Sequence, residues 1–254
     1  MRPLLLALSL VPFAVQAQVP AYSAPMLNGV RFRQSIRSQI RIETGSTVSQ
    51  ERSGRDGLIA LTATSSDSGI QITGWFDSLS VWREAGGRRY EPETDGMVGG
   101  RYRGVLSGSG AYAWADQPFI PEAISEIADM ATAFDDLLPP LPMGGLAVGQ
   151  AMALPGGWRI ERRADSASLI RFSLSGERRK TAVGAQLDST LVEAATFEKE
   201  MGTLLWDRSR GPMLWSRQIT MSAALPAKGA IRRAVRTQIE QSVLLERLEG
   251  APTH

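Results

Sequence analysis

The side chains that could do chemistry in this 254-residue chain are acidic and aromatic, because it has no cysteine and one histidine, His254. Without cysteine there is no disulfide, no thiolate zinc site and no thiol nucleophile. One histidine leaves no Ser–His–Asp triad and no histidine-rich metal site. No serine stands three residues before a lysine, and no phosphate-binding glycine loop or zinc-protease motif occurs. Carboxylates remain as candidate catalytic groups.

Two carboxylate pairs are close in sequence, Asp135-Asp136 and Glu198 with Glu200. A glycoside hydrolase needs two carboxyl groups a few ångströms apart. Adjacent acids on a helix point in different directions, so the first pair is poorly placed, although acids distant in sequence could also meet. We therefore keep a carboxylate-dependent hydrolase of envelope polysaccharide as the alternative function, and we assign no catalytic residue.

A third acidic group resembles part of a calcium loop. Acidic residues stand at alternate positions, Glu91, Glu93 and Asp95, and a glycine follows. These four residues match positions 1, 3, 5 and 6 of such a loop. Position 12 is Tyr102 rather than a bidentate glutamate, and Pro92 stiffens the start. We therefore expect no metal and no cofactor, and keep these three acids only as a weak calcium candidate.

Aromatic side chains are the remaining candidates for a binding site. Six lie in predicted strands and one in a predicted helix, where they could line a cavity for an apolar or saccharide ligand. Aromatic residues in strands more often belong to the core. The candidate ligand-binding residues are Trp75, Phe76, Trp82, Phe134, Trp158, Trp206 and Trp215.

The charge balance excludes one class of partner. Lysine and arginine number 28 against 26 acids, a net charge of +2. Such a small excess gives no basis for nucleic-acid binding.

The N-terminus has the pattern of a signal peptide. A cationic start, Met1-Arg2, precedes an apolar run from Leu4 to Val15, and Val15-Gln16-Ala17 predicts cleavage after Ala17. The apolar run is too short to span a bilayer core of ~30 Å. Prolines interrupt the later apolar stretch over 137–157, so we expect no transmembrane segment in the mature chain. The predicted location is periplasmic or extracellular.

Period-two alternation dominates the mature chain. Apolar and charged residues alternate from Val30 to Glu43, which predicts a strand with a row of arginines on one solvated face. We expect a connecting loop over 43–57, because it is polar and rich in glycine and serine. Within 69–84 the apolar phase shifts after Phe76, which predicts a β-bulge. Further strands are expected over 101–115, 158–163, 168–175, 181–187, 190–197, 202–207 and 212–222.

One segment has helical periodicity. Pro121 opens it, Pro139-Pro140 ends it, and an apolar face predicts a helix over 121–138. That face consists of Ile124, Ile127, Ala131, Phe134 and Leu138. We expect this helix to pack on the sheet as a structural plug, or to move and admit a ligand.

These elements predict a mainly β fold: a curved antiparallel sheet or half-open barrel around one central amphipathic helix. Residues after 230 fit a strand or a helix equally by periodicity, but 234–240 resembles 35–41, which favours a strand and suggests two similar β halves. The expected organisation is a signal peptide (1–17), an N-terminal β half (18–118), a helix and hinge (119–145) and a C-terminal β half (146–254), the two halves forming one compact domain.

Four segments resemble parts of uncharacterised exported bacterial proteins. Residues 139–150 resemble a proline-rich stretch leading into V-x-V-G-D-x-W, with Gln150 where an acid is usual and Met152 where tryptophan is usual. Residues 202–216 are similar to their G-x-L-x-W-D-x-x-x-G hairpin, and 76–81 and 95–100 look like further shared pieces. The resemblance implies a β-rich fold and an envelope location, with a distant fold analogy to periplasmic lipoprotein carriers.

The preferred function is a non-enzymatic ligand-binding, carrier or interaction module of the cell envelope. Its partner would be an apolar or saccharide ligand or an envelope protein.

Overall fold

The computed structural model describes residues 19–134, 137–154, 157–187, 190–227 and 233–249. The predicted cleavage after Ala17 lies outside these residues. The described helices are α1 (Ala24–Leu27) and α2 (Glu122–Ser125). The strands are β1 (Val30–Thr44), β2 (Thr47–Ser66), β3 (Gly69–Ala85), β4 (Arg88–Tyr90), β5 (Tyr102–Leu106), β6 (Tyr112–Asp116), β7 (Ala151–Leu154), β8 (Trp158–Asp165), β9 (Leu169–Leu187), β10 (Thr190–Asp207), β11 (Gly211–Leu225) and β12 (Val235–Leu248).

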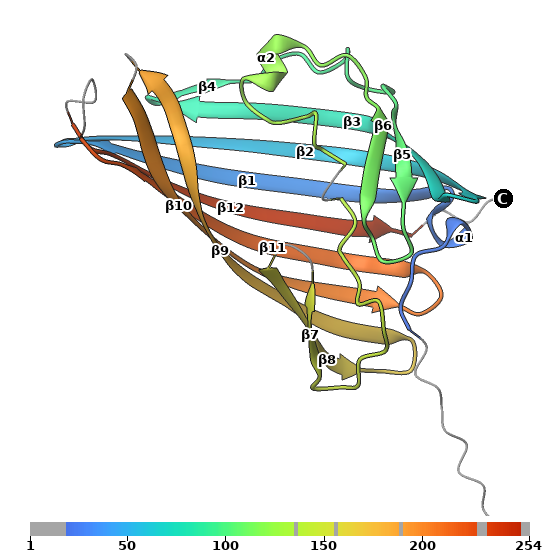
Figure 1. The fold of residues 1–254 in the computed structure, drawn as a ribbon. Helices are drawn as coiled ribbons and strands as arrows, with labels where there is room; N and C mark the ends of the chain where they lie inside the picture. The colour runs from blue at the N-terminus through green and yellow to red at the C-terminus, as the bar shows by residue number, and fades with distance from the viewer. Residues whose placement is uncertain (1–18, 135–136, 155–156, 188–189, 228–232, 250–254) are drawn as a thin grey trace, which may run out of the picture.

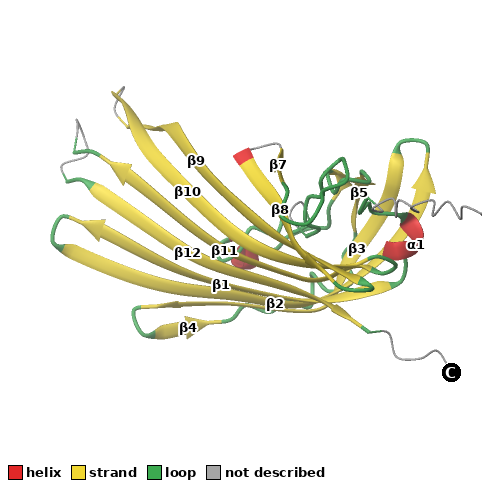
Figure 2. Ribbon diagram, turned by 90° about the horizontal axis from the view of Figure 1, so that it is seen from below, coloured by secondary structure: helices red, strands yellow, loops and turns green. Residues whose placement is uncertain are grey.

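All twelve strands belong to one antiparallel sheet, in the order β6-β5-β3-β2-β1-β12-β11-β10-β9-β8-β7, with β4 paired to β3. The sheet is strongly curved, so that it has a concave and a convex face (Figures 1 and 2). The predicted curved antiparallel sheet is therefore confirmed, and it remains open, because the described residues of β6 and β7 end the ladder without pairing.

The first and last strands meet in the middle of this sheet. β1 pairs with β12 from Arg31 opposite Leu248 to Thr44 opposite Val235. The strand prediction for the C-terminal segment is therefore correct, and the two similar heptapeptides lie on neighbouring strands. The division of the chain into two halves stays a prediction.

The hairpin between β1 and β2 corrects one expectation. The predicted loop over 43–57 is wrong, because β2 begins at Thr47 and only residues 45–46 turn, with Gly45 at a φ of +61°. The segment is polar because this end of the hairpin is exposed on both faces, so its composition resembles that of a loop. The predicted bulge in β3 is confirmed, since the register shifts between Leu58/Ser78 and Ile59/Phe76.

The segment from 117 to 150, which we call the strap, connects the two edge strands β6 and β7. It crosses the concave face near the end of the sheet where β2 turns into β3 (Figure 1). The predicted helix over 121–138 is wrong beyond Ser125, since most of the following described residues form turns. The predicted apolar face is correct in part, because Ala131 is exposed. The buried apolar side chains of the strap are Ile124, Met130, Ala133, Phe134, Leu137, Leu138, Leu141 and Leu146.

Hydrogen bonds to Asp129 and Met130 explain why the helix stops. The Asp129 carboxylate accepts the backbone N–H groups of Ala131 (3.0 Å) and Thr132 (3.3 Å), which a continuing helix would bond to earlier carbonyls. The Tyr102 hydroxyl donates to the Met130 carbonyl (3.0 Å), and Arg55 donates to the Asp129 carbonyl (3.4 Å). Side chains of the sheet thus take the acceptors that helical periodicity would have used.

Candidate functional site

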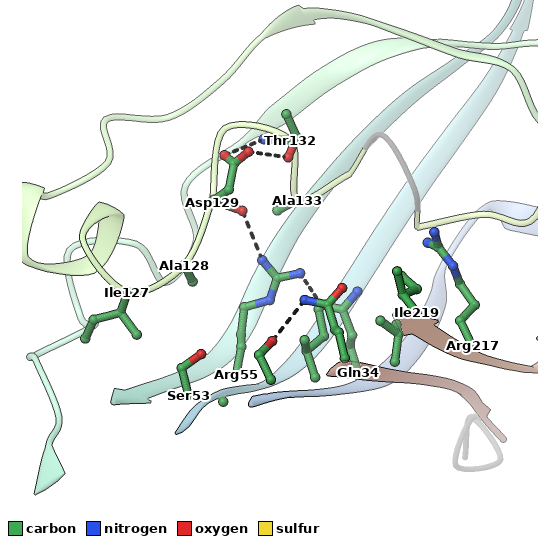
Figure 3. Close-up of a pocket in the computed structure, with 15 residues that line it drawn as sticks. Gln34, Ser53, Arg55, Ile127, Ala128, Asp129, Thr132, Ala133, Arg217 and Ile219 are labelled. Carbon is green, nitrogen blue, oxygen red and sulfur yellow. Dashed lines mark hydrogen bonds between the residues drawn. The ribbon is translucent and has the colours of Figure 1, made fainter. Parts of the chain in front are cut away.

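The strap and the sheet enclose a cavity of about 290 Å³ on the concave face (Figure 3). Its floor is apolar, formed by Ile36, Ile219 and Val243 from three neighbouring strands. Polar side chains surround this floor. They are Gln34, Ser38, Ser53, Arg55, Thr132, Arg217 and Gln241.

Arg55 lies on β2 opposite Ile36, so both side chains share the concave face. It is only 6% exposed. Its guanidinium donates to Oε1 of Gln34 (2.9 Å) and to the Asp129 carbonyl (Figure 3). It also donates to the sulfur of Met130 (3.3 Å). Burial lowers the pKa of Arg55 to about 10, although Tyr102 and Asp129 oppose the shift. The site therefore holds a cation that has lost much of its hydration.

A second cavity, of about 260 Å³, lies on the other side of the strap crossing, under Leu138, Pro139 and Pro140. It shares Arg217, Ile219 and Gln241 with the first cavity. The two cavities are therefore adjacent parts of one hollow, each near the lower end of the ~300–1,000 Å³ range of small-molecule sites.

Two ion pairs line the second cavity. Arg217 binds Glu200 through two contacts, Nε to Oε1 (2.5 Å) and Nη2 to Oε2 (3.2 Å), and both side chains are about nine-tenths buried. Arg178 binds Glu198 (3.2 Å) with both side chains partly exposed. Each of the two carboxylates therefore already accepts from a guanidinium.

Two tryptophans lie flat against strand glycines beside these ion pairs. A β-carbon at Gly176 would fall 2.0 Å from the Trp158 ring, and one at Gly202 would fall 2.8 Å from the Trp215 ring. Both rings line the second cavity, and Arg178 stacks on Trp158 at 4.2 Å. The absence of a side chain at Gly176, opposite Trp158, and at Gly202 on the strand next to Trp215 makes room for a flat aromatic surface here.

An apolar stripe continues from the cavities toward the β1–β2 turn. Its members lie on the concave face of the three central strands, because Ile36 pairs with Val243, Ile40 with Ile239, and Ile239 with Met221. The side chains of β2 and β10 on the same face are polar over this length, among them Ser53, Glu51, Glu198 and Thr196. We define the stripe as Ile36, Ile40, Ile42, Ile219, Met221, Ile239 and Val243.

Ile36, Ile219 and Val243 line the first cavity together with residues of the strap, whereas Ile40, Ile42 and Ile239 line neither cavity. Ile40, Ile42, Ile239 and Met221 are half-buried, whereas Ile219 and Val243 are buried beside the first cavity. A row of partly exposed aliphatic side chains that enters a polar-walled cavity has the form of a ligand groove.

The aromatic candidates separate into three locations. Trp158 and Trp215 line the second cavity. Phe76, Phe134 and Trp206 are buried in the core, where Phe134 stacks on Tyr102 with a centroid distance of 4.4 Å. The two others are Trp75 and Trp82, half-buried on the opposite face of the sheet, where arginines stack on them.

The arginine row of β1 is paired on that opposite face. Arg31 contacts Asp77 at 3.1 Å, Arg33 contacts Glu246 at 3.6 Å, and Arg37 contacts Asp56 at 2.8 Å. These exposed pairs form a solvated strand face, as expected.

The weak calcium candidate does not form a cluster. Glu91, Glu93 and Asp95 are exposed, and Glu91 pairs with Arg89. Among the described residues, no group of three or more histidine, cysteine or acidic side chains could hold a metal ion.

The sequence analysis missed Gln34, Arg55 and Arg217. Arg55 falls in the segment expected to be a loop, so its face could not be assigned. Arg217 lies within a predicted strand, but pairing it with Glu200 requires knowing that Ile219 is opposite Glu200 in the ladder.

Comparisons with known proteins give distant structural likenesses only. No family model matches the chain, and no curated protein matches it. A structure describing lipid–protein interactions in lipovitellin is similar over 90% of this chain, with 13% identity and a TM-score of 0.45; this chain spans 26% of that one. The β domain of the Bordetella autotransporter BrkA is similar over 85% of this chain and 99% of its own, with 13% identity and a TM-score of 0.28.

The attachment invasion locus protein Ail of Yersinia pestis is similar over 87% of this chain and 99% of its own, with 9% identity and a TM-score of 0.17. At these scores the likenesses carry no argument about function. None of the helices in the described ranges is long and apolar enough to cross a membrane.

Proposed function

We propose that the chain is an exported, non-enzymatic binding module whose ligand is an amphiphile lying in the hollow of the sheet. The observation that carries the proposal is the continuity of the apolar stripe with the polar cavities under the strap. Val243, Ile219 and Ile36 belong both to the stripe and to the first cavity. A ligand with an apolar chain and a polar head would match this change in surface character along the hollow.

The position of the stripe supports this proposal. Half-exposed aliphatic side chains on the concave face lose contact with water when an apolar chain covers them, which contributes about 25 cal/mol for each Å² buried. The strap and the core pack together at one end, so the stripe is presented on a rigid surface rather than on a loop. Little ordering of the protein is then required on binding.

Displacement of N-phenyl-1-naphthylamine, a neutral apolar dye, tests the proposal. The protein should enhance the dye's fluorescence, and decyl glucoside should displace it. Ile40→Ser with Ile239→Ser should weaken dye binding, because both side chains lie in the middle of the stripe. The matched control is Val48→Ser, which removes an aliphatic side chain that is 49% exposed on β2 but pairs with Glu43, on the other face. Equal loss in both variants, or no binding at all, would contradict the proposal.

Export is part of this proposal and rests on the N-terminal pattern. Mass spectrometry of the protein recovered from an envelope or culture fraction should find an N-terminus at Gln18. An intact Met1 on cytoplasmic protein would contradict export but would leave the ligand site unaffected.

The alternative function, hydrolysis of envelope polysaccharide, has one observation in its favour. Glu198 and Glu200 lie two residues apart on β10 and both line the second cavity with Trp158 and Trp215. Both carboxylates already accept from arginines, as described above. A polysaccharide hydrolysis assay decides this point: activity that disappears in both Glu198→Gln and Glu200→Gln would establish the enzyme.

A further inference from the structure

Arg55 is a buried cation whose hydrogen-bond acceptors within the described chain are neutral. Gln34 offers an amide oxygen, Asp129 a backbone carbonyl and Met130 a sulfur. Its Nε is buried and has no hydrogen-bond partner among the described residues. The carboxylate of Asp129 instead accepts the Thr132 hydroxyl (2.8 Å) (Figure 3). It also accepts the backbone N–H groups of Ala131 and Thr132. No carboxylate of the described chain forms an ion pair with Arg55.

Arg217 lines the same cavity as Arg55 but forms an ion pair, which makes it a useful comparison. Its guanidinium holds Glu200 through two contacts, although it is slightly more exposed than Arg55. Buried charges in proteins are normally paired, because taking an ion out of water costs several kcal/mol that only an opposite charge or several hydrogen bonds recover. Arg55 thus retains the capacity to bind an anion that the described protein does not supply.

The cavity beside Arg55 has space and further polar groups for such an anion. Ser53 precedes Arg55 by two residues on the same face of β2, and Thr132 closes the cavity from the strap. The hydroxyl of Ser38 and the amide of Gln241, joined by a hydrogen bond of 3.0 Å, lie on the neighbouring central strands. The apolar floor below them leads directly into the stripe.

We infer that the first cavity is the head-group site of the amphiphile, and that Arg55 binds an anionic head, either a carboxylate or a phosphate. This inference rests on the proposed function, because it assigns the charged end of the ligand whose chain the stripe holds. The head lies against Arg55 under the strap, and the chain extends along Ile40 and Ile239 toward the β1–β2 turn. A guanidinium suits either anion, because it presents parallel donors to two oxygens.

Ligands that share a decyl chain and differ only in the head test the inference. Decanoate, decyl phosphate, decyl glucoside and decyltrimethylammonium are each titrated, below micelle-forming concentrations, against protein carrying N-phenyl-1-naphthylamine. We expect the anionic ligands to bind about 10- to 100-fold more tightly than decyl glucoside, the factor typical of one charge-assisted hydrogen bond. Whichever anion binds more tightly identifies the head as carboxylate or phosphate, and either result supports the site.

Arg55→Gln should abolish the preference for anionic heads, so that within this variant decanoate and decyl phosphate bind no more tightly than decyl glucoside. Arg37→Gln is the matched control, because Arg37 lies on the other face of the adjacent strand β1 and is 2.8 Å from Asp56. This control should keep the full preference. If Arg55→Gln does not fold, Ser53→Phe provides an independent test, since it fills the cavity and leaves the guanidinium in place.

The outcomes separate this inference from the proposed function. If all four heads displace the dye equally, or if decyltrimethylammonium binds most tightly, the anion site is wrong and the apolar groove stands. If no decyl ligand displaces the dye, both fail. If Ser53→Phe retains the preference for anions, the head lies elsewhere and the assignment to this cavity is wrong.

Discussion

The ring of Phe134 on the strap fills the space left by Gly74 on β3: a β-carbon at position 74 would fall 2.0 Å from Cε1 of that ring. Phe134 is 4% exposed and also packs against Phe76 and Tyr102. The strap is therefore held on the sheet by a side chain that fits only over a glycine.

Phe134→Ala should lower the free energy of unfolding by about 3–5 kcal/mol, the usual cost of removing a buried aromatic ring. Gly74→Ala should also destabilise the protein, because the new methyl group and the ring cannot occupy the same space. Urea denaturation measures both changes. Phe119→Ala is the control, since Phe119 is on the same strap and 82% exposed. If Phe134→Ala instead leaves stability unchanged and increases uptake of the apolar dye, the strap is a movable lid rather than part of the core.

The Arg217–Glu200 pair should be costly to break and inexpensive to replace. Glu200→Leu alone or Arg217→Met alone should cost about 3–5 kcal/mol, because the remaining group stays buried without this partner. Glu200→Leu combined with Arg217→Met should cost much less than the sum of the single changes. The control pair Arg33–Glu246, whose side chains are 67% and 47% exposed, should be worth less than about 1 kcal/mol. Additive single and double changes in a double-mutant cycle would show that the two groups do not interact.

Asp207 should make the protein sensitive to acid. Burial alone would raise its pKa, but hydrogen bonds from the Ser209 hydroxyl and from the backbone N–H groups of Ser209 and Arg210 lower the pKa to about 2, from 3.8. Its contribution to stability is therefore fully present above pH 4 and is lost as the pH falls through 2. Denaturation midpoints between pH 5 and pH 2 should fall less steeply in Asp207→Asn than in Asp67→Asn, whose residue lies exposed in the β2–β3 turn.

Tyr102 should contribute the opposite dependence at high pH. Burial raises its pKa from 10.0 to about 12, although the charge of Arg55 opposes the shift. Stability is therefore full below pH 10 and declines as the pH rises through 12. Tyr102→Phe should cost about 1 kcal/mol at pH 7, since it removes the bond to the Met130 carbonyl. It should also make the decline above pH 10 shallower, whereas Tyr90→Phe, at a residue 53% exposed, should not.

The sheet was predictable from the sequence where one face is buried and the other is not. Val30 and Phe32 alternate with Arg31 and Arg33, and burial follows the same alternation over the first residues of the strand. The first part of β2 was not predictable, because both of its faces are exposed and its polar residues carry no alternation. Local composition therefore does not predict a strand that is exposed on both faces and stabilised only by hydrogen bonds to the neighbouring strand.

The candidate site was predictable only in part, for a related reason. Trp158 and Trp215 could be named because both are tryptophans within segments that the alternation predicts to be strands. Arg55 could not be named, because it lacks an acidic partner only as long as the Asp129 carboxylate binds the backbone N–H groups of Ala131 and Thr132. Those hydrogen bonds form a turn where the periodicity predicts a helix. Long-range contacts between the strap and the sheet override the local pattern, and they also create the cavity.

The pairing of β1 with β12 has a consequence for biosynthesis and transport. One edge of β1, the first strand to be synthesised, has no partner until the ribosome has added residues up to 248. A chain that folded as it was made would carry an open strand edge through most of its synthesis, and such edges recruit other chains. Delivery across a membrane before folding would avoid that exposure, since both strands would then become available within the same passage. The position of the seam thus makes completion of the sheet depend on the last strand to be synthesised.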